Sequence, residues 1–172
     1  MHPDGLVPAL IDGEQAPLGQ SLAIVEYLEE QFPTPSLLPE APSDRAFVRS
    51  VALQIACEIH PLNNLRVLGY LKSTLGIEDE QKTAWYAHWV TAGFETLERK
   101  LAADRRVGQC VFGDTPGLGD LCLIPQIWNA RRFNIPLDGY PTLGRLYDNV
   151  ASLPAFAKAE PSVQPDAEAP RG

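Results

Sequence analysis

The segment from Gly113 to Phe133 constrains the fold of this chain more than any other segment. From Leu118 to Phe133 it has the composition of one helix, with apolar side chains on nearly every face. A helix that is apolar all round is buried either in protein or in lipid. A bilayer span needs about 20 mostly apolar residues, and this segment is too short and too interrupted for that. The sequence therefore predicts that it forms the centre of a helical core.

Both ends of this helix are marked. Asp120 lies three residues after Gly117, where its carboxylate can accept hydrogen bonds from free backbone N–H groups at the positive end of the helix. Pro125 removes one backbone hydrogen bond and predicts a kink. Arg131 and Arg132 follow at the other end, where cations suit the helix dipole. On spacing alone, the two arginines are interpreted as solvated charges with that role.

The composition excludes several kinds of partner. The chain has 172 residues, enough for a large and a small domain, and a net charge of −8. This charge argues against nucleic acid and against anionic membranes, and an anionic substrate would need a locally positive pocket. The three cysteines without a CxxC pair suit a reducing cytosol, and each is expected to be a small buried hydrophobe. The three histidines are not clustered, so no metal site is expected.

The first forty residues alternate strand and turn patterns with one helix. Residues 6–11 are strand-like, Asp12-Gly13 indicates a hairpin turn, and residues 14–17 can form a return strand. A proline inside such a strand, Pro8, indicates an edge, a bulge or a special turn. A helix over residues 22–31 follows, with its glutamates expected to face water.

The start of that helix allows two interpretations. Ser21, after Gln20, is an ordinary capping candidate. The free N–H groups and the dipole at the same position can equally bind an anion. Residues 33–42 then hold four prolines and are predicted to form a semi-rigid linker at a domain boundary.

The rest of the chain is predicted to be helical. Ser43 and Asp44 are expected to cap a helix that runs toward Leu75. Pro61 should break or kink it, and His60 should leave helical geometry because proline disfavours the α region for the residue before it. Further helices are predicted from a start within residues 76–79 to about 103, over 118–133, from 141 onward, and as one turn over 153–156.

The central segment resembles the core helix of zeta-class glutathione transferases, which include the maleylacetoacetate and maleylpyruvate isomerases. The resemblance rests on Gly113-Asp-Thr-Pro116, Asp120-Leu-Cys-Leu123, Pro125-Gln126 and Asn129-Ala-Arg-Arg-Phe133. The chain departs from that family at Gly117, where Thr or Ser is usual, and at Gly119. These glycines predict a looser helix start, by a few tenths of a kcal/mol at the cap and about 1 kcal/mol within the first turn.

The resemblance also implies roles in the N-terminal part. Asp4-Gly-Leu-Val-Pro-Ala-Leu10 is similar to the family segment that holds a cis-proline in a thioredoxin-like domain. By this similarity, Val7 and Pro8 offer backbone groups to the cysteinyl part of glutathione. Gln20 and Ser21 match the pair that binds its γ-glutamyl carboxylate.

The segment Glu58–Leu68 resembles a motif typical of the zeta group, which implies that His60, Asn64 and Arg66 line the cleft and meet glutathione or the substrate. From the residues alone, the segment is also consistent with a kinked helix that has a solvated polar face. His60 and Asn64 share a helix face, whereas Arg66 points nearly opposite. All three reach one pocket only if the helix is irregular at Pro61.

The resemblance begins in the middle of the family's first domain. A strand, a helix and a second strand, a unit of roughly 30 residues or more, would precede Met1. In the zeta group that unit carries a Ser-Ser-Cys-like motif that activates the glutathione thiol, so no catalytic residue is assigned here. The chain is expected to be either an N-terminally clipped version of a longer protein or a natural short form.

The expected fold class is therefore α+β. A partial thioredoxin-like, glutathione-binding domain of a β-hairpin plus a helix should occupy residues 1–33, with a linker at 34–42. An all-α glutathione-transferase C-terminal domain should follow at 43–162, with a flexible tail at 163–172. A cytoplasmic homodimer is implied, paired through the helices on either side of the linker, with no membrane or nucleic-acid partner.

The resemblance implies a glutathione-dependent cis–trans isomerase of maleylacetoacetate, in aromatic amino acid catabolism, with glutathione as its cofactor. Arg132 is expected to anchor a carboxylate of the dicarboxylate substrate and Arg66 to supply a second positive group, because a guanidinium pairs with both carboxylate oxygens. Arg131 is the less favoured partner. The alternatives are a maleylpyruvate isomerase, a general glutathione transferase, or a non-catalytic interaction module that has lost the thiol-activating motif.

Overall fold

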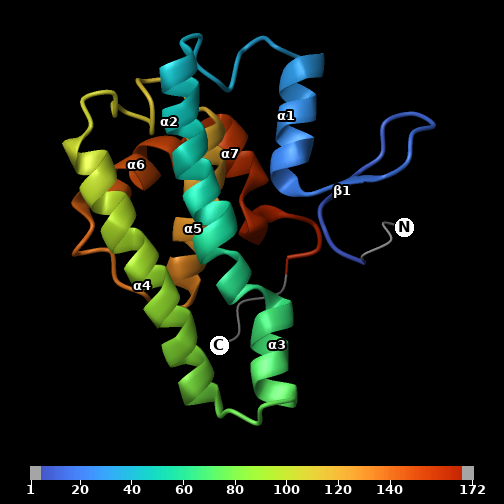
Figure 1. Cartoon of the computed structure of the whole chain (residues 1–172), viewed down its shortest axis with the longest axis vertical. Coiled ribbons are helices and arrows are strands. Elements are labelled where there is room, and N and C mark those ends of the chain that lie inside the picture. Colours follow the sequence, from blue (N-terminus) through green and yellow to red (C-terminus); the bar gives the residue numbers. More distant parts are fainter. Residues whose placement is uncertain (1–4, 168–172) are drawn as a thin grey trace.

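The computed structural model describes residues 5–167, in which a small hairpin precedes a bundle of helices (Figure 1). The parts of the expected N-terminal domain at 1–4 and of the expected tail at 168–172 lie outside the described residues. The elements in chain order are β1 (Ala9–Leu10), β2 (Leu18–Gly19), α1 (Ser21–Gln31), α2 (Pro42–Leu53), η1 (Gln54–Ile59), η2 (Pro61–Asn63), α3 (Leu65–Ser73), α4 (Asp79–Ala103), α5 (Leu118–Arg132), α6 (Pro141–Ala151), α7 (Pro154–Ala159) and η3 (Pro161–Val163).

The hairpin is shorter than the sequence predicts. β1 pairs antiparallel with β2, with Ala9 opposite Gly19 and Leu10 opposite Leu18. The return strand therefore lies at 18–19, and its prediction at 14–17 is wrong. Pro17 has no N–H to give to a ladder, so pairing begins only after it. Residues 11–17 form the connecting loop, in which the Gln15 N–H donates to the Asp12 carbonyl.

Helix α1 is attached to the following segments through its glutamates. Glu29 accepts hydrogen bonds from the backbone N–H of Leu37 at 2.8 Å and from the Ser36 hydroxyl at 2.6 Å. Glu26 forms an ion pair with Arg49 of α2 at 2.9 Å. The prediction that the glutamates of this helix face water is confirmed for Glu30, which is exposed, and Glu26 remains 45% exposed within its ion pair. Glu29 is half-buried, because the chain folds back across this side of α1.

The long helix predicted from residue 43 to Leu75 is interrupted. It begins at Pro42, a residue type suited to the first turn, and no side chain caps it. After Leu53 it widens into the π-helix η1, then tightens into the 3₁₀ turn η2, and α3 follows. A proline in an α-helix clashes with the carbonyl four residues earlier, and the wider η1 accommodates Pro61 instead.

The backbone break falls later than predicted. His60 keeps helical angles, with φ −58° and ψ −43°, so the prediction that it leaves α geometry is wrong. Asn64 is the extended residue, with ψ 148°, and its side chain caps α3 by accepting a hydrogen bond from the Arg66 N–H at 3.0 Å. Capping by Asn64 stabilises a new helix start directly beside Pro61.

Helix α5 forms the centre of the core, as predicted. It packs against α2, η1 and α6, and in Figure 1 it lies behind α2. Its side chains Leu123, Ile127 and Ala130 are fully buried. The helix begins at Leu118 and contains Pro125, and the equally well predicted α4 begins at Asp79.

The buried Asp120 organises the start of α5. Its carboxylate accepts hydrogen bonds from the backbone N–H groups of Gly117 and Val111, both at 2.9 Å. Burial raises the pKa of Asp120, and these backbone hydrogen bonds oppose that rise. The predicted reach of this carboxylate to the helix start is confirmed, and it also fixes the incoming loop.

The structure explains why residue 117 is a glycine. The Leu118 N–H donates to the Leu37 carbonyl of the linker at 3.0 Å. A Cβ on residue 117 would lie 2.6 Å from that carbonyl oxygen, closer than side chains tolerate. Glycine therefore allows the linker to supply an acceptor to the start of α5, where the sequence suggested only a weaker cap.

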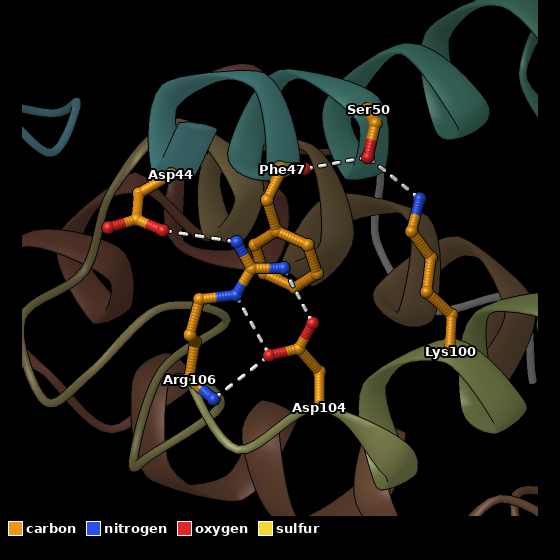
Figure 2. A network of polar contacts seen from close by, with 6 residues as sticks. All are labelled: Asp44, Phe47, Ser50, Lys100, Asp104 and Arg106. Atoms are coloured by element: carbon orange, nitrogen blue, oxygen red, sulfur yellow. Dashed lines mark hydrogen bonds and ion pairs between the residues drawn. The ribbon is translucent and has the colours of Figure 1, made fainter. Parts of the chain in front are cut away.

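A second polar cluster joins α2 to the loop after α4 (Figure 2). Arg106 donates two hydrogen bonds to the Asp104 carboxylate, at 2.7 and 2.9 Å, and one to Asp44 at 3.0 Å. Its guanidinium lies 4.0 Å from the centre of the Phe47 ring. Hydrogen bonds from Arg106 lower the pKa of Asp104 to about 2.

No helix within residues 5–167 combines the length and the apolar composition that a membrane crossing requires.

Candidate functional site

A cavity of about 510 Å³ lies where the N-terminal hairpin meets the helical part of the chain. Its walls come from three places: the residues around β1 and the start of α1, the irregular segment from η1 to α3, and one face of α5. All the residues that the sequence assigns to glutathione line this cavity: Val7, Pro8, Gln20, Ser21, His60, Asn64 and Arg66.

The hairpin contributes the Val7–Pro8 peptide, which is cis. The Val7 side chain is 92% exposed, so packing does not hold it in place. Val7 lies outside the two-residue strand β1 that follows, so its backbone groups are not part of that strand's ladder.

The start of α1 forms a second part of the same wall. Gln20 has φ 69° and ψ 112°, a conformation that costs a non-glycine residue about 1–3 kcal/mol. Ser21 is the first residue of the helix, and its side chain makes no capping hydrogen bond, so the capping interpretation is wrong. Within residues 5–167, the first N–H groups of α1 therefore have no side-chain partners at the cavity, where a helix terminus favours an anion.

The irregular segment brings together three side chains that a regular helix would separate. His60 ends η1, Asn64 precedes α3, and Arg66 lies in the first turn of α3, and all three line the cavity. The π-helix before His60 and the 3₁₀ turn between His60 and Asn64 provide the irregularity at Pro61 on which this convergence depends.

Helix α5 supplies the third wall, which the sequence analysis missed. Cys122, Pro125, Gln126 and Asn129 line the cavity at helical spacing, so they share one face of α5. A pattern in the sequence could have revealed this wall, because Gln126 and Asn129 are polar residues in an otherwise apolar helix.

The cysteines differ in their surroundings. Cys110 is buried and Cys122 is half-buried, and burial raises the pKa of each thiol to about 11. Cys57 lines the cavity and is exposed, so the prediction that every cysteine is buried is wrong for this one. Residue 57 faces away from the core because η1 turns this side toward the hairpin.

The two arginines at the end of α5 occupy different surroundings. Arg132 is exposed and is not among the residues that line the cavity. It lies three residues after Asn129, which places it one turn further along the same face. Burial raises the pKa of Tyr86, and the positive charge of nearby Arg132 opposes that rise.

Arg131 points elsewhere. It forms an ion pair with Asp148 at 3.4 Å, and its guanidinium lies 4.0 Å from the centre of the Tyr147 ring. Both partners belong to α6, so these contacts direct Arg131 toward that helix.

The cavity differs in charge from the chain as a whole. Arg66 and His60 are its basic residues, and none of the described residues that line it is acidic. The chain carries a net charge of −8. An anionic ligand is therefore repelled by the average field and attracted at this one place.

A smaller cavity of about 260 Å³ lies between the linker and residues 111–120. Its two carboxylates already have partners, since Asp120 binds backbone N–H groups and Asp114 accepts from the Gln109 N–H at 2.9 Å. Among the described residues that line this cavity there is no arginine, lysine or histidine.

Comparison with known proteins places this geometry in context. Residues 1–36 match the family model of the glutathione S-transferase N-terminal domain. A probable maleylacetoacetate isomerase of Vibrio cholerae serotype O1 is 48% identical to this chain over 167 residues, which are 97% of this chain and 76% of that protein.

Two solved structures extend the similarity. A maleyl pyruvate isomerase, described as a bacterial zeta-class glutathione S-transferase, superimposes with a TM-score of 0.93 at 46% identity, covering 96% of this chain and 78% of that one. A maleylacetoacetate isomerase from Methylobacterium extorquens AM1, solved with bound malonate and GSH, superimposes with a TM-score of 0.91 at 40% identity, covering 97% and 78%.

Proposed function

The chain belongs to the zeta class of glutathione transferases, the family of the maleylacetoacetate isomerases, and on that premise we propose that it is a glutathione-dependent cis–trans isomerase of maleylacetoacetate. Glutathione is its cofactor, and the substrate is a diketo dicarboxylate consumed in aromatic amino acid catabolism. The residues that line the cavity hold both molecules.

One observation carries the proposal. The hairpin, the start of α1 and the η1–α3 segment, which the family resemblance assigns to glutathione, line a single cavity that has an arginine and, among the described residues, no acidic side chain. The bound malonate and GSH of the Methylobacterium relative are the kind of ligands that such a cavity suits. The free N–H groups at the start of α1 would receive the γ-glutamyl carboxylate, and Val7-Pro8 would pair with the cysteinyl backbone.

The chemistry uses the glutathione thiolate as a nucleophile. Its sulfur adds to the cis double bond, and the π electrons move to the conjugated keto oxygen to give an enolate. Rotation about the resulting single bond is followed by expulsion of the thiolate, which restores the double bond in the trans form. The protein's part is to place the sulfur and to hold the two substrate carboxylates during the rotation.

The carboxylates require cations. We assign one to Arg132, one turn beyond Asn129 on α5, and we assign Arg66 of the cavity wall as a second positive group. A guanidinium pairs with both oxygens of a carboxylate, which fixes orientation as well as charge. In this division of labour, residues 1–33 bind glutathione together with His60, Asn64 and Arg66. Residues 43–162 also hold the substrate, with the 34–42 linker between the two parts.

A second candidate reaction has support from one of the comparisons. The maleyl pyruvate isomerase structure is as similar to this chain as the maleylacetoacetate isomerases are. The two substrates both carry a maleyl group and a keto acid, and the same residues would serve both. Turnover of each substrate by the purified chain decides between them.

The experiment that tests the proposal measures binding and turnover on the same preparation. Glutathione affinity is determined by calorimetry on the folded chain, and isomerisation of maleylacetoacetate is followed with and without glutathione. Turnover that requires glutathione supports the proposal. Glutathione binding without turnover supports a non-catalytic module instead, and a folded chain that binds no glutathione contradicts the assignment of the cavity.

We also propose a cytoplasmic homodimer that pairs through α1 and α2. Phe32, directly after α1, is 70% exposed, and Leu53 at the end of α2 is 46% exposed, which is unfavourable for large apolar side chains in water. Light scattering gives the mass directly. A dimer that dissociates on Phe32→Ser supports this pairing, and a monomeric wild-type chain contradicts it.

A further inference from the structure

Gln126 is the one side chain on the α5 wall that is both polar and almost wholly buried. It is 4% exposed, and it lines the cavity. The other buried polar side chain of α5, Asp120, has its carboxylate fully engaged by backbone N–H groups. The Gln126 amide makes no hydrogen bond to any side chain or backbone group within residues 5–167.

The Gln126 amide is open to the cavity. Among the described residues, the sealed side-chain polar atoms without a partner are Asn63 Oδ1 and Trp89 Nε1, and neither belongs to Gln126. The small exposed fraction of Gln126 is therefore the surface that its amide presents to the cavity. A buried amide without a partner is unfavourable, so a ligand that supplies the missing hydrogen bond binds with a more favourable free energy.

The surroundings indicate which ligand atom suits it. Ile55, Leu121 and the half-buried Cys122 line the cavity together with Gln126. A carboxylate beside a neutral amide in such apolar surroundings would lose more hydration than it regains. A keto oxygen is neutral in the ground state and gains charge only during reaction, which suits a preorganised neutral donor.

We propose that Gln126 is the residue that recognises the keto group of the substrate, by donating a hydrogen bond from its Nε2 to the keto oxygen conjugated with the double bond. The assignment rests on the proposed isomerase function. When the glutathione sulfur forms its bond to the alkene carbon, the π electron pair moves onto this oxygen. The hydrogen bond strengthens as the enolate forms, and it weakens when the electron pair returns and the carbon–sulfur bond breaks. No proton is gained or lost.

The assignment makes Gln126 a specificity-determining residue. A site with a buried hydrogen-bonding group rejects analogues that lack the matching atom, because its own group is then left unpaired. The site should therefore bind dicarboxylates with a keto group at C4 more tightly than dicarboxylates of the same length that lack this group. Contacts between arginines and the carboxylates do not give this preference, since both kinds of ligand have two carboxylates.

The test compares Gln126→Met, which keeps the volume and removes the amide, with Gln109→Met on the exposed loop after α4 as a control. The first measurement is kinetic. Gln126→Met should lower kcat about 100-fold, the effect of removing one donor to a developing oxyanion. Its glutathione affinity should stay within about twofold of the wild type, and Gln109→Met should change neither quantity.

The second measurement does not depend on turnover. The glutathione-bound chain is titrated with 4-oxoheptanedioate and with heptanedioate, which differ by one keto oxygen. The wild type should prefer the keto acid by about tenfold, the value of one hydrogen bond, and Gln126→Met should bind the two equally. A preference that survives Gln126→Met overturns the assignment. A wild type with this preference and no isomerisation contradicts the proposed function and leaves Gln126 as a keto-recognition residue.

Discussion

The Oδ1 atom of Asp120 accepts a hydrogen bond at 2.9 Å from the backbone N–H of Val111, nine residues earlier and outside helix α5. The same carboxylate caps the helix through its other oxygen. One buried side chain thus holds the start of the central helix and the loop that leads into it.

Replacing Asp120 with alanine should be strongly destabilising. Two backbone N–H groups lose their acceptor, and each unsatisfied buried donor costs about 1–3 kcal/mol, so we expect a loss of about 2–6 kcal/mol in the free energy of unfolding. Urea denaturation measures this loss. Asp114→Ala, which removes a single acceptor in an exposed turn, is the control and should cost about 1 kcal/mol or less. Equal losses for both variants would contradict the role given to Asp120.

Ser21→Ala should separate binding from stability. The Ser21 side chain caps nothing in α1, so its removal should leave the free energy of unfolding within about 0.5 kcal/mol of the wild type. If its hydroxyl meets the γ-glutamyl carboxylate, glutathione affinity should fall roughly tenfold, as expected for one hydrogen bond to a charged group. Calorimetry and thermal denaturation provide the two readouts. Unchanged affinity would remove Ser21 from the site.

Arg132→Ala should weaken isomerase turnover and leave glutathione affinity nearly intact. We expect kcat/KM to fall by at least about tenfold, since a guanidinium–carboxylate contact contributes about 1.5–3 kcal/mol. Arg131→Ala is the matched control, because Arg131 is engaged with Asp148 and Tyr147 on α6. Equal losses of turnover and glutathione affinity in Arg132→Ala would move this residue out of the substrate role.

The Asp104–Arg106 pair should make stability depend on pH. The pKa of Asp104 is lowered to about 2 in the folded chain, against about 3.9 when unfolded. A lowered carboxyl pKa stabilises above the unfolded value, and the contribution is lost as pH falls from about 4 toward 2. Asp104→Asn should therefore cost about 1 kcal/mol at pH 7 and progressively less below pH 4.

The control for this pH dependence is Asp79, whose pKa is also lowered to about 2, through Lys72 and Lys82. Its side chain is 66% exposed, so water and salt screen its ion pairs. Asp79→Asn should have a smaller effect that disappears in 1 M salt. A pH-independent effect of Asp104→Asn would show that its carboxylate charge does not stabilise the fold.

Much of the helical part could be predicted from the sequence because its causes are local. The apolar faces of α5 and the spacing of Asp120 from Gly117 identify a buried, capped helix without any tertiary information. The start of α4 could likewise be predicted, to within residues 76–79. The family resemblance supplied the cavity residues of the hairpin, of the start of α1 and of the η1–α3 segment, which composition and periodicity alone do not identify, but not those of α5.

Other features depend on contacts that the sequence does not display. The π-helix η1 adds one residue to a turn, which leaves the hydrophobic pattern almost unchanged while it redirects His60 and Arg66. The left-handed backbone of Gln20 is unexpected for a non-glycine residue, because local preference disfavours it. The acceptor that replaces a capping side chain at Gly117 is the carbonyl of Leu37, eighty residues earlier, and a local sequence pattern cannot predict such a contact.

The exposure of Cys57 gives this molecule an internal reporter. Cys110 is buried and Cys122 is half-buried with a pKa of about 11, whereas Cys57 stands open on the cavity wall. A maleimide dye should consequently attach at Cys57 first, without any engineered thiol. Glutathione analogues that lack a thiol, such as S-methylglutathione, should slow this labelling when they fill the cavity, so that occupancy can be followed by the rate of dye incorporation.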